Sequence, residues 1–454
     1  MRVITIVSVL ASIVPYLASA RWTRNDKCPT EIETTIPNYR SDFGSMVSVH
    51  EALSQCPNIS SLDLRVTLIG CSGWPDRWNF PFNHNGGEKY PDLKKLRLEG
   101  YDFSNLDDVR PPWQMPLQGR SDAEAWTFRL YDWIRQGYWK PWLQAQIYGH
   151  PSLPPLKSNL DLWLGAMNWS AIEELAISDC SDELIEKLPS HLHSLRKLES
   201  TNISFVEALP NNTLERLTWI GPHKHGNLDS ILQRQGGRLR ELEIRDDELD
   251  WSYMRSKFNV SIIPDMAPNL THLSINILRN GSWSPEPFRA VSQLSHLESL
   301  NIYSNLQSQC QRQKPEEYTR DWLKWRAEHG ESYCVDEDRF QKPLLNESSA
   351  EELYNLMKGA NPRGLLQNVT FRIGDWKPIW DGPLYSPPWM EGRRVEIHCS
   401  EVGKEKFEKH CEMVQSYGYW PPGSNTKGET NWMFEDQLWD FGEDINHISA
   451  HPDV

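Results

Sequence analysis

A repeated pattern of apolar residues organises the middle of the chain. Nine segments have an apolar residue at the first and fourth positions, and an apolar residue (once serine) at the sixth: residues 59–64, 93–98, 172–177, 195–200, 214–219, 239–244, 270–275, 297–302 and 366–371. Alternation over the last three positions puts two apolar side chains on one face of a short strand. The polar residues between them face the other way. The pattern predicts a series of short strands separated by connections long enough to hold helices.

The spacing of these segments favours stacked repeats. From Ile172 to Leu297 the first positions are separated by 23, 19, 25, 31 and 27 residues, which brackets the leucine-rich-repeat period of about 20–29 residues. Amphipathic-helix spacing alone does not explain the third apolar residue two positions on. One such unit cannot bury its apolar face, whereas stacked units share a continuous core. We expect an α/β fold, a leucine-rich-repeat solenoid with a curved parallel sheet and helices on the convex side.

Helix-forming segments and two insertions lie between the predicted strands. Residues 182–188 and 286–294 suit the convex side. The first insertion, about residues 106–169, is rich in Trp and Pro, and the second, about residues 307–364, includes an amphipathic helix near residues 350–357. The expected organisation is a signal peptide (1–20), an N-terminal cap (21–55), the repeat domain (56–375), a C-terminal cap (376–425) with a strand at 395–399, and an acidic tail (426–454).

Over roughly residues 50–375 the segments resemble the leucine-rich-repeat superfamily, particularly the irregular type found in F-box/LRR proteins. Residues 90–103 (YPDLKKLRLEGYDF) and 159–177 (NLDLWLGAMNWSAIEELAI) are similar to stretches of secreted LRR proteins of filamentous fungi. No F-box-like helical segment precedes the repeats, and the export signal described next disagrees with a cytosolic role. The resemblance implies the fold and carries no activity over to this chain.

The N-terminus has the three parts of a secretory signal peptide. Arg2 is followed by an apolar run over residues 3–17 and by Ala-Ser-Ala at residues 18–20, a small-x-small cleavage pattern. The alternative is an uncleaved anchor, but the run is shorter than the roughly 20 residues of a bilayer span, and Pro15 interrupts it. We expect cleavage after Ala20, secretion to the extracellular space or cell wall, and no membrane insertion afterwards.

Glycosylation motifs and cysteines agree with export. Nine N-x-S/T sequons begin at Asn58, Asn168, Asn202, Asn211, Asn259, Asn269, Asn280, Asn346 and Asn368, and a glycan needs a surface position. An even number of cysteines in a secreted chain favours disulfides. Pairing by proximity predicts Cys56–Cys71, Cys310–Cys334 and Cys399–Cys411, which leaves Cys28 for Cys180.

The net charge and the absence of catalytic motifs argue against nucleic-acid binding and against several classes of enzyme. A formal charge of −15 has the wrong sign for nucleic acid. The sequence has no G-x-S-x-G, H-E-x-x-H, phosphate loop or dinucleotide fingerprint, so we predict a non-enzymatic protein without cofactor. The H-x-H pairs at 191/193 and 223/225 are placed at opposite edges of the sheet by the repeat register, and we expect no metal site. With 62 Asp and Glu residues, a carboxylate pair of glycosidase type stays undecided.

Two sets of residues are binding candidates. On the outward face of the predicted strands we select Arg97, Arg216, Glu243, Arg245, His272 and Tyr303, although an ordinary solvated sheet would also be polar there. In the first insertion we select Trp133, Trp139 and Trp142, whose indoles could stack on sugar rings or instead pack beneath the loops as small cores.

The function predicted from sequence is therefore extracellular recognition by a secreted glycoprotein, with a protein or glycan partner. A cell-wall polysaccharide binder or hydrolase that uses the Trp-rich insertion is the first alternative. A structural wall glycoprotein is the second.

Overall fold

The computed structural model describes residues 28–36, 41–66, 82, 87–101, 103, 157–177, 180–220, 228–245, 259–279, 281–313, 320–330, 334, 338, 340–374, 394–401 and 410–417. The chain divides into two compact units, residues 1–210 and 211–454. Both are built from alternating strands and helices, so the α/β class expected from the sequence is confirmed. The sheet is open and mostly parallel.

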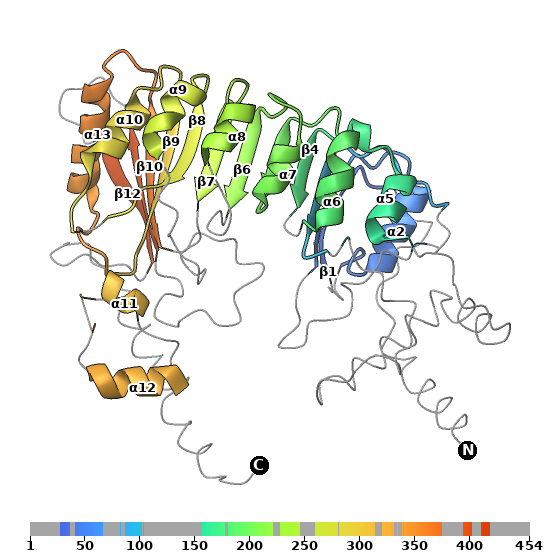
Figure 1. The fold of residues 1–454 in the computed structure, drawn as a ribbon, viewed down its shortest axis with the longest axis horizontal. Coiled ribbons are helices and arrows are strands. Elements are labelled where there is room, and N and C mark those ends of the chain that lie inside the picture. Colours follow the sequence, from blue (N-terminus) through green and yellow to red (C-terminus); the bar gives the residue numbers. More distant parts are fainter. Residues whose placement is uncertain are drawn as a thin grey trace, which may run out of the picture. The chain divides into compact units, whose positions relative to one another are not determined.

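The described residues of the first unit include five parallel strands that lie in the order of the sequence: β1 (Glu31–Ile36), β2 (Ser61–Val66), β3 (Lys95–Glu99), β4 (Glu174–Ile177) and β5 (Lys197–Ser200). Its helices are α2 (Met46–Gln55), α5 (Asn159–Ala166), α6 (Asp182–Lys187) and α7 (Ile203–Ala208), with single 3-10 turns at η4 (Trp169–Ala171) and η5 (Leu188–His191). Figure 1 shows α6 and α7 together on one side of these strands.

The second unit begins with five parallel strands, β6 (Arg216–Ile220), β7 (Glu241–Arg245), β8 (His272–Asn276), β9 (Ser299–Ser304) and β10 (Asn368–Gly374). Two antiparallel strands, β11 (Arg394–Ser400) and β12 (Cys411–Tyr417), complete its sheet. The helices are α8 (Leu228–Gln235), α9 (Ile263–Met266) after the turn η7 (Val260–Ile262), α10 (Pro285–Ser292), α11 (Gln309–Gln313), α12 (Arg320–His329) and α13 (Glu347–Ala360). In Figure 1, α8, α9, α10 and α13 lie on one side of the strands.

The apolar positions of the repeated segments form continuous columns in each unit. In the first unit, strand register aligns Leu62, Leu96, Leu175 and Leu198. In the second it aligns Leu217, Leu242, Leu273, Leu300 and Val369. All nine side chains are at most 2% exposed. Burying a leucine contributes roughly 1.5–3 kcal/mol, so these shared columns are the main source of stability for the strands.

Aromatic rings fill the space under α5 in the first unit. Trp163 is fully buried and lies edge-on to Tyr90, Tyr101 and Trp169. Its indole Nε1 donates to the hydroxyl of Tyr101 at 3.1 Å, and Nε1 of Trp169 donates to the carbonyl of Trp163 at 3.0 Å. These two tryptophans of the predicted first insertion therefore belong to the hydrophobic core.

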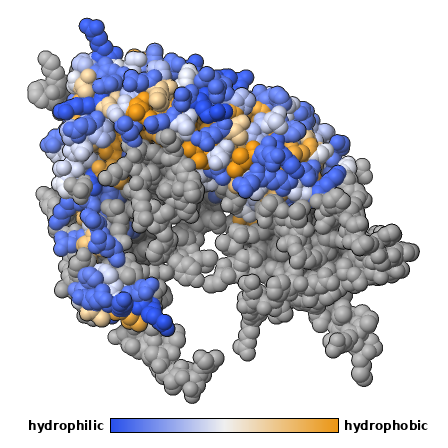
Figure 2. All heavy atoms as spheres, viewed as in Figure 1, coloured by the Kyte–Doolittle hydropathy of each residue, from blue (hydrophilic) through white to orange (hydrophobic). Residues whose placement is uncertain are grey.

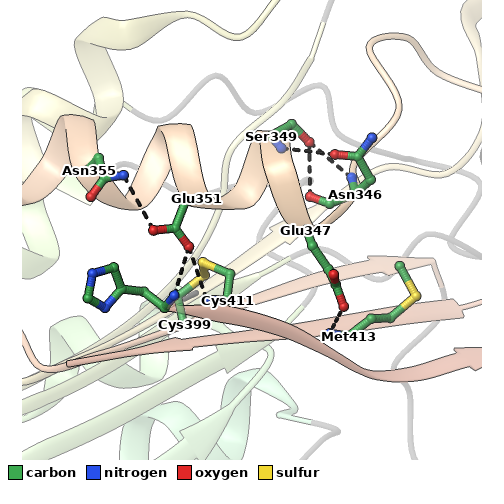
Figure 3. The surroundings of a disulfide bond; sticks show 9 residues. Asn346, Glu347, Ser349, Glu351, Asn355, Cys399, Cys411 and Met413 are labelled. Carbon is green, nitrogen blue, oxygen red and sulfur yellow. Dashed lines mark hydrogen bonds between the residues drawn. A yellow bond between two sulfur atoms is a disulfide. The ribbon is translucent and has the colours of Figure 1, made fainter. Parts of the chain in front are cut away.

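Helix α13 lies against β12, the last strand of the second unit, and hydrogen-bonds to its backbone (Figure 3). Helix α13 begins at a capping box, in which Asn346 and Ser349 satisfy each other's backbone N–H groups. One turn further on, Glu351 accepts hydrogen bonds from the backbone N–H groups of His410 (3.0 Å) and Cys411 (3.1 Å). Glu347 accepts from the N–H of Met413 at 3.1 Å. Two carboxylates thus accept hydrogen bonds from backbone N–H groups of an edge strand. Without them, these groups could pair with a strand of another chain.

Three disulfides join cysteines among the described residues, and they correct part of the predicted pairing. Cys310–Cys334 and Cys399–Cys411 are confirmed, the second joining directly opposite residues of β11 and β12. Cys28 bonds to Cys56, so the predicted pairs Cys56–Cys71 and Cys28–Cys180 are wrong. The reason is parallel pairing. Residues that precede two neighbouring parallel strands, β1 and β2, come together although 28 positions separate them. Cys71 lies outside the described residues, and the sulfur of Cys180 is 3.8 Å from the Oγ of Ser200.

Several predicted elements are found, and two strands were missed. The helices near residues 182–188, 286–294 and 350–357 correspond to α6, α10 and α13, and the strand at 395–399 to β11. Helix α13 packs against α10 and contacts β11 and β12, so this part of the predicted second insertion belongs to the main fold. Strands β1 and β12 were not predicted. In the part of the chain that the structure describes, no helix is long and apolar enough to cross a bilayer.

Candidate binding surface

The outward face of the strands, opposite the apolar columns, carries polar residues in register. In the first unit one row runs Asp63, Arg97, Ala176 and Glu199. In the second unit the residue directly after each repeated segment belongs to a row along one end of the strands: Arg245, Asn276, Tyr303 and Arg372, continued on β11 by Glu396. Because strands hold alternate side chains on a common face, both rows are fixed by the sheet itself.

Ion pairs link the outward residues of the first unit into an Arg97 cluster, defined as Asp63, Arg65, Arg97, Glu99 and Glu199. Arg97 donates two hydrogen bonds to the carboxylate of Glu199, Nη1 to Oε1 at 2.9 Å and Nη2 to Oε2 at 2.5 Å. Its Nε lies 3.5 Å from Oδ2 of Asp63, and Arg65 donates to the same oxygen at 3.0 Å. A bidentate pair of this kind fixes both side chains as well as neutralising them.

Burial and charge interactions shift the pKa values of Asp63 and Arg97 in this cluster. Desolvation raises the pKa of Asp63 above its ordinary value, although Arg65 and Arg97 act in the opposite direction. Burial would lower the pKa of Arg97, but its hydrogen bonds and charge interactions with Glu199 and the charge of Asp63 outweigh that effect, so the pKa is raised. The cluster contains more carboxylates than guanidinium groups, and its arginines are already paired within it.

The second unit carries a Tyr303 cluster, defined as Glu243, Arg245, Tyr303, Arg372, Glu396 and His398. The guanidinium carbons of Arg245 and Arg372 lie 5.3 Å and 5.6 Å from the centroid of the Tyr303 ring. Arg372 also donates to the hydroxyl of Tyr303 at 3.0 Å. Two cations within reach of one aromatic ring hold it in place, Arg372 from the neighbouring strand β10 and Arg245 from β7, two strands away.

Each of these arginines also has a carboxylate partner. Nε of Arg245 donates to Glu243 at 2.7 Å, and the Arg245 side chain is only 8% exposed. Nη2 of Arg372 donates to Glu396 at 3.0 Å, and His398 lies 2.5 Å from the same oxygen of Glu396. The cluster presents an immobilised phenol, paired cations and paired anions on one face.

The pKa values of Glu396 and Arg372 are shifted by their pairing with each other and with their neighbours. Burial alone would raise the pKa of Glu396, but hydrogen bonds from His398 and Arg372 and the charge of Arg372 together hold it below its ordinary value. Burial would likewise lower the pKa of Arg372, and Tyr303 and Glu396 reverse that shift. Both groups are therefore held in their charged forms.

The structure brings together three of the residues selected from sequence and separates the others. Glu243, Arg245 and Tyr303 meet in the Tyr303 cluster. Arg216 pairs with Glu241 at 3.3 Å at the other end of the strands, half exposed. His272 is exposed, with its Nδ1 2.9 Å from the hydroxyl of Thr271. Arg97 belongs to the first unit, and Trp133, Trp139 and Trp142 lie outside the described residues.

Sequence reasoning missed Arg372, Glu396 and His398. A signal for Arg372 was available, because Arg245, Tyr303 and Arg372 all hold the sixth position after the first apolar residue of their segments. Glu396 and His398 come from β11, whose antiparallel return along β10 brings them to the same face. That pairing has no local signature in the repeats.

Other surfaces of the described residues carry fewer features that indicate a binding site. Among the described residues no group of His, Cys, Asp and Glu is arranged to hold a metal ion. Figure 2 shows a largely hydrophilic surface over the helices with small separate hydrophobic patches. The large hydrophobic side chains that are exposed in the described segments, Leu323, Leu365 and Val414, come from three different places in the second unit. They do not form the contiguous apolar patch that marks many protein interfaces.

The sequons lie at exposed positions. Of the eight sequon asparagines in the described segments, seven are exposed and Asn202 is half-buried; Asn280 lies outside them. Asn168, Asn202 and Asn259 each accept, through Oδ1, the backbone N–H of the serine two residues on. The amide nitrogen is not part of that turn, so capping by the oxygen is compatible with a glycan on the nitrogen.

No family model matches the chain, and no curated protein or solved structure is similar to it.

Proposed function

We propose that the chain is a secreted leucine-rich-repeat protein of the irregular type, with its strands wound into a solenoid. The repeated segments, their register in each unit and the three disulfides support this assignment. Two further positions agree with it. The leucine-rich-repeat consensus has Asn or Cys three positions after the last apolar residue of the strand segment, and Cys180 and Asn305 occupy that place in their repeats. Asn305 is fully buried and donates to the carbonyl of Gln307 at 3.0 Å.

The proposed activity is recognition of a polar extracellular ligand, a protein surface or a glycan, on the outward face. The observation that carries this proposal is the Tyr303 ring held by Arg245 and Arg372, each with its own carboxylate. Tyrosine and arginine are enriched among the few residues that supply most of the binding energy of an interface. Side chains already fixed on strands lose little entropy when a ligand binds.

The internal charge pairing indicates the character of the ligand. Each arginine of the cluster is matched by a carboxylate, so the surface has no large excess of either sign. A strongly charged polymer would have to disrupt these pairs, whereas hydroxyls, amides and backbone groups could bond to their remaining donors and acceptors. We therefore expect a largely uncharged polar epitope.

The test uses the full-length protein secreted from a eukaryotic host and immobilised. The probes are chitin, β-glucan and cellulose, and the extracellular proteins of the producing organism. The variants are Tyr303→Ala and Arg372→Met, with Arg289→Ala, on an exposed position of α10, as the matched control. A ligand retained by the wild type and by the control, but lost by both cluster variants, supports the proposal.

Two outcomes favour other functions. Retention on a polymer that survives Tyr303→Ala and disappears in Trp139→Ala would indicate a polysaccharide binder that uses the Trp-rich segment. No retention of any probe would favour a structural wall glycoprotein.

A further inference from the structure

Five of the sequons lie near the N-terminal end of a strand, from zero to six residues before its first residue. Each lies just before a strand or at its first residue: Asn58 before β2, Asn168 before β4, Asn211 before β6, Asn269 before β8 and Asn368 at the start of β10. All five asparagines are exposed. They therefore lie at the N-terminal ends of the parallel strands, which form one edge of the sheet in each unit.

The five sites alternate with strands that have none. In the first unit β3 pairs with both β2 and β4, and no sequon leads into β3. In the second unit β7 lies between β6 and β8, and β9 between β8 and β10, again without leading sequons. Neighbouring strands are about 4.8 Å apart, so alternate strands are separated by about 9.6 Å. The wider spacing gives room for a branched oligosaccharide at each site.

We propose that each unit carries a row of N-linked glycans along the N-terminal edge of its strands, on every second strand. This inference rests on the proposed secretion, because the sugar donor, a polyprenyl-diphosphate-linked oligosaccharide, is met on the export route. In the transfer, Nδ2 of Asn forms a bond to C1 of the first sugar and loses one proton. The C1–O bond to the diphosphate breaks, and polyprenyl diphosphate leaves with the electron pair.

Local contacts are compatible with attachment. Nδ2 of Asn269 donates one hydrogen bond to the carbonyl of Gly237 at 3.0 Å, and a glycosylated asparagine keeps one N–H for such a bond. Nδ2 of Asn168 is 3.5 Å from Asp92. In contrast, Asn202 is half-buried at the opposite end of its strand, with Nδ2 3.5 Å from the carbonyl of Cys180.

One site of the row lies on the strand that carries Arg372 of the Tyr303 cluster. Asn368 is the first residue of β10, and Arg372 lies four residues further along the same strand. At roughly 3.3 Å per residue, the two positions are about 13 Å apart. Asn368 and Arg372 share the outward face of β10 because they are an even number of residues apart. A glycan at Asn368 would therefore restrict a ligand's approach to the Tyr303 cluster from the N-terminal ends of the strands.

Mapping the glycosylated asparagines by mass spectrometry tests the proposed row of glycans. The secreted protein is treated with a peptide N-glycosidase in heavy-oxygen water, which converts each glycosylated Asn to labelled Asp, and is then analysed by peptide mass spectrometry. We expect label at Asn58, Asn168, Asn211, Asn269 and Asn368. Secreted protein with unlabelled strand-leading sites would overturn the row alone. Protein that stays inside the cell would instead overturn the secretion on which it rests.

A second variant tests the alternation. Combining Arg238→Asn with Arg240→Ser creates a sequon before β7, between the sites of Asn211 and Asn269, at two exposed positions. The matched control, Arg238→Gln with Arg240→Ser, loses the same Arg238–Glu215 ion pair without adding a sequon. We expect glycosylation of the new site and a several-fold lower secreted yield than the control, because three neighbouring strands would then carry glycans. Equal yields of the glycosylated variant and the control would contradict the spacing argument.

Discussion

Arg97 on β3 reaches across β4 and forms a bidentate ion pair with Glu199 on β5, at 2.9 Å and 2.5 Å. The residue between them in register is Ala176, which is 9% exposed. A methyl group at that place leaves room for the guanidinium. The outward face of the first unit is thus organised over three strands by the smallness of one side chain.

The pair should contribute measurably to stability. Exposed ion pairs contribute about 0.2–1 kcal/mol, and the bidentate geometry places this half-buried pair near the upper end. We expect a double-mutant cycle of Arg97→Met and Glu199→Gln to give a coupling energy of about 1 kcal/mol in chemical denaturation. The same cycle in an Ala176→Met background should give no coupling, whereas Ala176→Ser should preserve it. Coupling that survives Ala176→Met would show that the pair does not depend on the small residue.

Glu351 should stabilise the last strand of the second unit. Its carboxylate accepts from the N–H groups of His410 and Cys411, and unsatisfied buried donors cost about 1–3 kcal/mol. We expect Glu351→Ala to lower the free energy of unfolding by about 2 kcal/mol and Glu351→Gln to lower it less, since an amide oxygen can still accept. Glu352→Ala, at the next and exposed position of α13, is the control. Faster amide exchange at Cys411 in Glu351→Ala would confirm the cause, and unchanged exchange would contradict it.

The low pKa of Glu396 links stability to pH. Because the carboxylate is favoured in the folded state, its contribution is complete above the ordinary value of 4.5 and is lost as the pH falls through the lower folded-state pKa. Arg372→Met removes one of the groups that lower it. We expect the pKa of Glu396 to rise in that variant, as measured by NMR titration of labelled carboxyl carbons. The wild type's stability advantage should shrink in acid; an advantage that grows with falling pH would have the wrong sign.

The Cys28–Cys56 disulfide ties the start of β1 to the segment before β2. In the chain-entropy description, a loop of this length gives about 3.5 kcal/mol, and we expect Cys28→Ser with Cys56→Ser to lose about that amount. Peptide mapping without reduction should recover a Cys28–Cys56 linked peptide that disappears on reduction. A peptide linking Cys56 to Cys71 would instead support the pairing predicted from proximity.

Much of the fold could be read from alternation within the repeated segments. That pattern identified the core columns, the outward face and three members of the Tyr303 cluster, because each depends only on strand periodicity. Strand β1 was missed since residues 31–36 alternate without the preceding apolar residue, and β12 since its apolar residues do not alternate regularly with polar ones. Its position depends on Cys399 and on carboxylates of α13, which are contacts between distant parts of the chain.

The disulfides show the same difference between contacts that sequence proximity predicts and contacts that depend on strand pairing. Sequence proximity succeeded for Cys399–Cys411, which joins neighbouring antiparallel strands, and failed for Cys28, whose partner is set by parallel pairing of β1 and β2. Glu396 and His398 were missed for the equivalent reason, since only the return of β11 along β10 carries them to Tyr303 and Arg372.

Titration calorimetry measures whether the Tyr303 cluster is the surface that binds the ligand. The titrant is the extracellular protein or polymer fragment retained by the wild type, measured against the wild type, Tyr303→Ala, Arg372→Met and Arg289→Ala. Loss of an interface hot spot costs about 2 kcal/mol or more, so we predict that Kd rises about 30-fold or more for both cluster variants and stays unchanged for Arg289→Ala. Unchanged Kd values for Tyr303→Ala and Arg372→Met would contradict the account.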